Sequence, residues 1–510
     1  MDLKDTPSSA ASIAAYYPTD STRSEDQQPS SAHGRAEMPS SRNLNVVDWD
    51  GPDDLENPIN WNSGRKATIV TLVSVITFLS SLSSSVFAPG ILQVMGDFNS
   101  TNEALASFIV SVYVIGYAFG PLLIAPLSEI YGRSPLYHTC SALFAIFTVA
   151  CAVAPNLSAL LVFRLFAGLA GSCPLTAAAG TIADIVPYER RGKIMAAWGI
   201  GPLLGPVIGP IAGGYLTDTK GWRWSFWVVA IAAGTVLILS FFFLHETYAY
   251  IILDRKASKL RKETGNQELR SVLDTGRSPK EIFKIAIVRP SKMLVFSPII
   301  FLLSLYMFLV YGYLYLIFTA MPVVFTDTYG FTSGSIGLTY IGLGIGSFFG
   351  LVVSGATSDR LAQRMASKAG GDAKPEYRLP IVVVAAVVIP IGLFCFGWTA
   401  ELHQHWVLPI VGTAIVSFGV TLAFMASSTY LIDAYGAYAA SAVAASTVLR
   451  SLGGALLPLS GGPMFAALGL GWGSSLLAFI AIAMIPVPVV LIKYGESIRQ
   501  KTHFSVKREI

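Results

Sequence analysis

Long apolar runs recur along this chain, and they limit its possible folds more than any other feature. A helix needs about 20 mostly apolar residues to cross the ~30 Å hydrocarbon core of a bilayer. Hydrophobic residues make up 53% of the chain and charged residues 13%, a balance that soluble globular proteins do not normally show. Runs of sufficient length predict twelve spans, near residues 67–88, 105–126, 136–154, 159–182, 193–215, 225–244, 294–318, 332–356, 380–398, 406–431, 440–464 and 473–492.

The spans form two sets of six, separated by a polar segment. This spacing predicts an all-α membrane protein with twelve transmembrane helices in two six-helix, pseudo-symmetric halves. Five regions follow: a disordered cytosolic tail at 1–60, a first half at 61–244, a cytosolic central loop at 245–293, a second half at 294–493 and a cytosolic tail at 494–510.

Short stretches of the first half recur in the second. Residues 120–129 align without a gap with residues 350–359, which places Arg133 and Arg360 at equivalent turns. Residues 210–214 are likewise echoed at 458–462. Internal symmetry of this kind is typical of a duplicated transporter, whose substrate site lies between the repeats near the bilayer midplane.

Lysine and arginine accumulate in alternate loops, as they do on the cytosolic side of membrane proteins. The pattern predicts an integral membrane protein with both termini in the cytosol, and we expect a monomer in the plasma membrane. The basic residues reflect topology, so no nucleic-acid partner is expected. Two sequons on the predicted outer side, at Asn99 and Asn156, are candidate glycosylation sites.

The fifth span carries an unusual density of small and breaking residues. At about 3.6 residues per turn, glycines four apart share one face of a helix. Small residues let membrane helices approach closely, so tight packing explains most of these positions. The alternative is a broken helix at a surface where two halves slide. The predicted hinge and packing residues are Gly201, Pro202, Gly205, Pro206, Gly209, Pro210, Gly213 and Gly214.

Two arginines, Arg164 and Arg450, fall inside predicted spans. A charge there costs at least ~2.5–3.5 kcal/mol on insertion scales, and so it suggests function by default. Either arginine could instead be structural, donating to backbone carbonyls. In the functional interpretation Arg450 binds an anionic group of the substrate. Since no Asp or Glu lies deep in a span, the cavity is net positive and we expect a neutral or anionic small-molecule substrate.

Acidic residues instead stand at the cytosolic ends of spans, close to arginines. We predict an ion-pair gate there, with helix capping and topology as the alternative. Its members are Glu129, Arg133, Asp184, Arg190, Arg191, Asp359 and Arg360. Aromatic residues are candidates for the cavity wall, although each could equally serve packing. They are Tyr113, Tyr117, Tyr311, Tyr315, Tyr340 and Phe424.

Several of these stretches resemble the major facilitator superfamily, specifically the twelve-span drug:proton antiporter branch of fungi. They are residues 120–133, Arg164 with Gly168, and residues 201–214. The resemblance implies the major facilitator fold and proton-coupled export of drugs, toxins, organic acids or fungal secondary metabolites by alternating access. It also implies a role for Arg164 in proton coupling. His245 departs from the pattern, since proline is expected there.

Two other functions stay open: an importer or facilitator of a small polar nutrient, and a transport-inactive membrane sensor. An enzyme is not expected, because the six histidines are scattered and no P-loop or GxSxG motif is present. No cofactor or metal is expected either. The four cysteines fall inside apolar runs and lack metal-ligand spacing.

Overall fold

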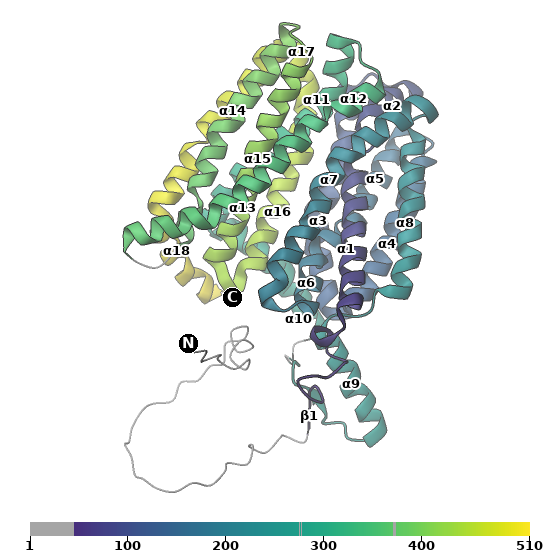
Figure 1. The fold of residues 1–510 in the computed structure, drawn as a ribbon, viewed down its shortest axis with the longest axis vertical. Helices are drawn as coiled ribbons and strands as arrows, with labels where there is room; N and C mark the ends of the chain where they lie inside the picture. The colour runs from purple at the N-terminus through teal and green to yellow at the C-terminus, as the bar shows by residue number, and fades with distance from the viewer. Residues whose placement is uncertain (1–44, 275, 277, 371–373, 510) are drawn as a thin grey trace, which may run out of the picture. The chain divides into compact units, whose positions relative to one another are not determined.

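A computed structural model describes residues 45–274, 276, 278–370 and 374–509, and nearly all of them are helical (Figure 1). Residues 1–44, most of the predicted N-terminal tail, lie outside the described residues. The first half of the chain contains α1 (Ser63–Ser85), α2 (Ile91–Asp97), α3 (Glu103–Tyr131), α4 (Arg133–Ala152), α5 (Leu157–Gly171), α6 (Cys173–Ile185), α7 (Tyr188–Lys220) and α8 (Arg223–Phe243).

The second half follows with α11 (Pro298–Tyr329), α12 (Ser333–Thr339), α13 (Ile341–Ala369), α14 (Pro380–Glu401), α15 (Val407–Tyr435), α16 (Ala439–Leu456), α17 (Gly461–Ala483) and α18 (Pro486–Glu509). Local sequence sets the helix ends. The Asn102 side chain accepts hydrogen bonds from the N–H groups of Ala104 and Leu105 and so caps α3. At the other end, Gly132 adopts a φ of 96° that side chains disfavour, and this stops the helix.

Eleven helical segments of the described residues are long and apolar enough to cross a membrane. The last, Ala439–Gln500, has 62 residues, which would span about 93 Å as one straight helix. It turns at Gly469 (φ 76°, ψ 172°), where the Glu401 carboxylate accepts the N–H groups of Leu470 and Gly471. This segment therefore crosses twice, and the prediction of twelve spans is confirmed.

The predicted central loop contains two helices, α9 (Ala249–Thr264) and α10 (Pro279–Phe296). Residues 45–60 of the predicted tail are also ordered: β1 (Val46–Val47) pairs with β2 (Arg270–Ser271). Lys256 of α9 forms an ion pair with Asp50 at 2.8 Å. Backbone N–H groups of Asp50 and Glu56 donate to Asp54 and lower the pKa of its carboxyl group. The central loop and the end of the tail are therefore held in regular structure by polar contacts, which a search for apolar runs does not detect.

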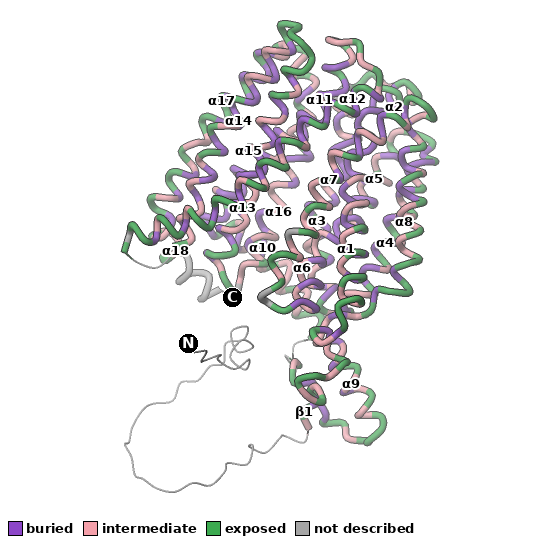
Figure 2. The backbone as a smooth tube through the Cα atoms, in the orientation of Figure 1, coloured by how far each residue is buried: buried purple, intermediate pink, exposed green. Residues whose placement is uncertain are grey.

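We call the end of the bundle near α9 and α10 the proximal end, and the end near α2 and α12 the distal end (Figure 1). Buried residues gather where helices face one another, and exposed ones follow their outer faces (Figure 2). The two halves meet along α3 and α16 and along α7 and α12. Ser111 of α3 donates to the Ala455 carbonyl at 2.9 Å, and Asp218 of α7 accepts the Gly334 N–H at 2.7 Å.

Helix α7 is continuous from Tyr188 to Lys220, although Pro202, Pro206 and Pro210 lie inside it. The alternative of a broken helix is therefore wrong. Its glycines face α1 of the same half, where a Cβ on Gly213 would lie 1.6 Å from the Val86 carbonyl oxygen. Gly201, Gly205 and Gly209 also face α1. Only Gly214 turns to the other half, where its Cβ would lie 2.4 Å from the Ser333 oxygen.

We expect Gly213→Ala to destabilise the protein by about 1–3 kcal/mol, because the new methyl group must push α1 away from α7. The measurement is the thermal unfolding midpoint of the purified protein in detergent. Gly199→Ala in the same helix is the matched control. No atom lies within 4 Å of a Cβ there, so this variant should be neutral or slightly stabilised. Equal effects of the two substitutions would contradict the packing.

Candidate functional site

Arg164 lies inside the first half with only 1% of its surface exposed. Its Nε donates to the Ile109 carbonyl at 2.6 Å, and one Nη donates to Ser84 at 3.1 Å and Val110 at 3.4 Å. No carboxylate pairs with this guanidinium among the described residues. The contacts match the structural interpretation, in which an arginine satisfies backbone carbonyls of α1 and α3. A role in proton coupling stays a prediction.

Tyr113 and Tyr117 of α3 meet a serine of α1 beside this arginine. The Ser80 hydroxyl lies 2.8 Å from the Tyr117 hydroxyl and 3.3 Å from that of Tyr113. Tyr113 also donates to the Ser80 carbonyl at 3.0 Å and is fully buried. This hydrogen-bonded cluster joins α1 and α3, so Tyr113 packs inside the half rather than against a ligand.

Arg450 also lies beside aromatic rings, as Arg164 does, but its hydrogen bonding differs. Its guanidinium carbon lies 4.5 Å from the Phe424 ring centre and 4.8 Å from that of Tyr311. Its Nε is buried and has no hydrogen-bond partner among the described residues. The Tyr315 ring centre lies 5.2 Å from that of Tyr311 in the same cluster, with the two rings tilted by 53°. The structure thus brings together four of the predicted cavity residues, from α11, α15 and α16.

Tyr340 does not join this group. It is fully buried, its hydroxyl donates to the Phe318 carbonyl at 2.7 Å, and its ring packs 5.1 Å from that of Phe318. These contacts fix the break between α12 and α13 against α11. Tyr340 therefore has a packing role in this structure.

A charged cluster closes the proximal end of the first half. Arg133, the first residue of α4, donates through Nη1 to the Ser128 hydroxyl at 2.5 Å and through Nε to Asp184 at 3.4 Å. Its guanidinium also lies 4.8 Å from the Tyr248 ring. The arginine therefore links α3, α4 and α6 within one half.

The second half repeats this cluster with the same atoms. Nη1 of Arg378 donates to the Ser358 hydroxyl at 2.9 Å and to Asp359 at 2.8 Å, while its Nε pairs with Asp433. The predicted equivalence of Arg133 with Arg360 is therefore wrong. Arg360 is exposed and forms no ion pair within the described ranges. Arg378 and Asp433 are the members of this second cluster that were not among the predicted gate residues. Each lies where a span meets the proximal end.

The other predicted gate residues lie outside these two clusters. Arg191 donates to the carbonyls of Ala183 and Val186 at the end of α6, at 2.9 and 3.4 Å. Arg190 and Glu129 are both exposed, and neither forms an ion pair in the described part of the chain. The structure thus groups Asp184 with Arg133 rather than with Arg190 or Arg191.

Glu246 is a further polar residue, which was not among the predicted gate residues. Its carboxylate accepts the backbone N–H groups of Arg133 at 2.9 Å and Ser134 at 3.3 Å. A Cβ on Gly132 would lie 2.2 Å from the same carboxylate, so only glycine fits there. Glu246, the third residue after α8, therefore caps α4 and holds Arg133 in place. An acidic residue just after the sixth predicted span was the sequence feature that could have indicated this cap.

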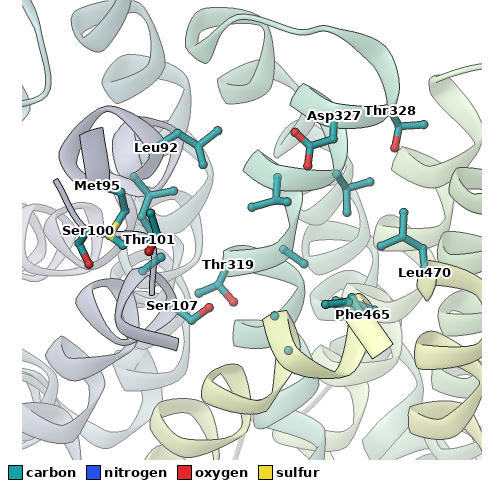
Figure 3. Close-up of a pocket in the computed structure, with 18 residues that line it drawn as sticks. Leu92, Met95, Ser100, Thr101, Ser107, Thr319, Asp327, Thr328, Phe465 and Leu470 are labelled. Atoms are coloured by element: carbon teal, nitrogen blue, oxygen red, sulfur yellow. The ribbon is translucent and has the colours of Figure 1, made fainter. Parts of the chain in front are cut away.

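A cavity of about 480 Å³ opens between the halves at the distal end (Figure 3). Its walls are largely apolar and come from α2, α3, α11 and α17, with Met95 and Phe465 on opposite sides. Its polar lining consists of the Asp327 carboxylate and the hydroxyl groups of five residues: Ser100, Thr101, Ser107, Thr319 and Thr328. The size suits a small organic molecule. Because four separate segments contribute, no local sequence pattern marks it.

The predicted glycosylation sequons both lie in distal loops or turns. Asn99 adopts a φ of 50°, and the Asn156 side chain caps α5 by accepting the Ala159 N–H at 2.8 Å. Their use stays a prediction. Among the described residues, no group of three or more His, Cys, Asp or Glu side chains could hold a metal ion.

Twelve membrane spans in two repeated halves, with aromatic and cationic side chains facing one another inside, define a membrane transporter for small molecules. Similarity to known proteins identifies its family. The family model of the Major Facilitator Superfamily matches residues 73–458, and the chain belongs to this superfamily.

Curated relatives support the assignment. The chain is 56% identical to the MFS-type transporter penM of Penicillium rubens over 462 residues, 91% of each protein. It is 50% identical to the efflux pump radE of Floropilus chiversii, covering 91% of this chain and 87% of that protein. The partially occluded, inward-open xylose transporter XylE of E. coli shares the fold, with a TM-score of 0.62 at 17% identity over 85% of this chain and 98% of that one.

We expect Arg378→Ala to destabilise the second half by about 1–2 kcal/mol. The substitution leaves Asp359 and Asp433 without their shared cation, although partial exposure weakens the effect. Arg360→Ala, at the exposed arginine nearby, should change stability by less than about 0.5 kcal/mol. Thermal unfolding of both variants in detergent checks this. A larger loss for the Arg360 variant would restore the equivalence that the sequence suggested.

Proposed function

We propose that this protein is a proton-coupled antiporter that exports a small neutral or anionic metabolite by alternating access. The observation that carries the substrate class is Arg450, whose buried Nε lacks a partner beside the rings of Tyr311 and Phe424. A cation in hydrocarbon is costly unless a partner satisfies it. A carboxylate, phenolate or carbonyl oxygen of a bound substrate would supply that partner, and the two rings would contact its apolar body.

Export is supported by similarity and by charge. One relative at 50% identity is named an efflux pump. Arg133, Arg190, Arg360 and Arg378 all lie at the proximal end of spans, so the positive-inside rule makes that end cytosolic. The distal cavity of Figure 3 then lies on the outer side, where an exported molecule would leave.

Proton coupling would use carboxylates whose arginine contacts change between states. Asp184 beside Arg133 and Asp433 beside Arg378 occupy matching places in the two halves. An opposite charge within reach favours the ionised carboxylate, so separation of the arginine would favour proton uptake. Each of these ion pairs joins residues of the same half. The proposed gate therefore acts by moving helices within a half, and not by a bridge between the halves.

Purified protein in vesicles with an imposed pH gradient tests the proposal. We expect saturable movement of neutral or anionic compounds from a metabolite panel, and its loss when a protonophore collapses the gradient. Strong, saturable spermidine transport that leaves neutral compounds and organic acids untouched would end the proposal.

Arg450→Gln should reduce transport of an anionic compound by about ten- to a hundredfold, since a hydrogen bond to a charged group contributes about 1.5–3 kcal/mol. The matched control is Arg255→Gln, at an exposed arginine of α9. Transport rates relative to the amount of folded protein are the readout. Unchanged anion transport in the Arg450 variant would show that this guanidinium does not contact the substrate.

A further inference from the structure

A groove runs along the proximal end of the bundle between the last turn of α3 and the first turns of α10. Its volume is about 520 Å³. Leu127, Ile130 and Tyr131 line it from α3, and Phe283 and Ile287 line it from α10. This α3–α10 groove lies at the proximal end, opposite the distal cavity, and the two share no lining residue. The proposed transport function does not involve the groove.

The outer surface of α10 changes character along its length. Lys280 and Lys284 are exposed in its first turns, one helical turn apart, and both line the groove. Further along, Val295 is 72% exposed and Phe296 is 55% exposed. Helix α10 ends there, and Ser297 caps the membrane-spanning α11. A basic start and an apolar end are what a helix needs to pass from the headgroup layer into hydrocarbon.

The acidic residue in the same turns does not neutralise the lysines. Glu281 accepts the Ser278 N–H at 3.0 Å, and its own N–H donates to the Ser278 hydroxyl at 3.3 Å, which forms a capping box. Neither lysine forms an ion pair with a carboxylate in the described portion of the chain. Two cations therefore stand free at the mouth of an apolar groove.

We propose that the α3–α10 groove binds an anionic phospholipid, with its phosphate between Lys280 and Lys284 and an acyl chain along Leu127, Phe283 and Ile287. Basic pockets beside membrane helices recognise anionic headgroups in this way. An acyl chain fits this groove better than a soluble metabolite does, because its walls are apolar side chains of α3 and α10, with Lys280 and Lys284 as its cations. The groove is a lipid site, distinct from the transport path.

The position of α10 gives the bound lipid a consequence. This helix packs against α3 of the first half and against α16 of the second. An occupant held between α3 and α10 would therefore favour the arrangement in which both halves contact α10. Any movement that separates α3 from α16 at the proximal end would alter the groove and change the affinity for the lipid.

Native mass spectrometry of the full chain, with phosphatidylglycerol and phosphatidylcholine in competition, tests the site. We expect the wild type to retain phosphatidylglycerol preferentially. The double variant Lys280→Ala, Lys284→Ala should bind it about thirtyfold more weakly, from about 1 kcal/mol for each lysine near the surface. Ile287→Trp keeps both charges but fills the apolar groove, and it should also lose retention. Lys259→Ala with Lys262→Ala, two exposed lysines of α9, should behave as wild type.

Thermal unfolding in lipid nanodiscs gives a second readout that also reports on folding of the variants. Phosphatidylglycerol should raise the midpoint of the wild type and of the α9 control by a few degrees, but not that of the groove variants. Three results would each overturn the proposal: no preference for the anionic lipid, equal retention by the double lysine variant, or equal protection by inorganic phosphate in phosphatidylcholine nanodiscs. The last result would indicate a free-anion site.

Discussion

Close contact between helix backbones is the constraint on which the rest of this structure depends. Lipid offers no hydrophobic drive for helices to associate, so packing and polar contacts must hold them together. A Cβ on Gly168, Gly213, Gly346 or Gly453 would lie within 2.2 Å of a carbonyl oxygen on a neighbouring helix. In each of these pairs, both residues belong to the same half of the chain. At Gly337 the same kind of contact, 2.4 Å from the Pro210 oxygen, joins the two halves.

Such dense packing decides what a buried charge can do. Arg164 sits among carbonyls that close packing exposes, and three of them accept from it. Both arginines also lie near aromatic rings, but the Nε of Arg450 has no hydrogen-bond partner among the described residues. The two arginines therefore differ in their hydrogen bonds rather than in their aromatic neighbours. The polar clusters of Arg133 and Arg378 lie at the proximal end. Solvent there lowers the free energy needed to separate each arginine from its carboxylate.

The spans, their number and the glycine face of α7 could be predicted from sequence, because apolar length and four-residue spacing are local properties. Arg378 could not. The gap-free alignment places Arg360 at the same turn as Arg133, but only three residues separate Glu129 from Arg133, whereas eighteen separate Asp359 from Arg378. The longer loop moves the equivalent arginine to the start of the next span. The α3–α10 groove and the distal cavity were missed for a related reason, since each joins segments far apart in sequence.

The charge of the proposed substrate also sets the energy available for export. Inward movement of one proton carries one positive charge, worth about 2.3 kcal/mol per 100 mV of membrane potential. Outward movement of a monoanion carries a second charge equivalent in the same direction, which doubles that contribution to about 4.6 kcal/mol. A cation leaving against one proton would gain nothing from the potential. Arg450, whose Nε has no partner in the described part of the chain, therefore suits a carrier that uses the membrane potential as well as the pH gradient.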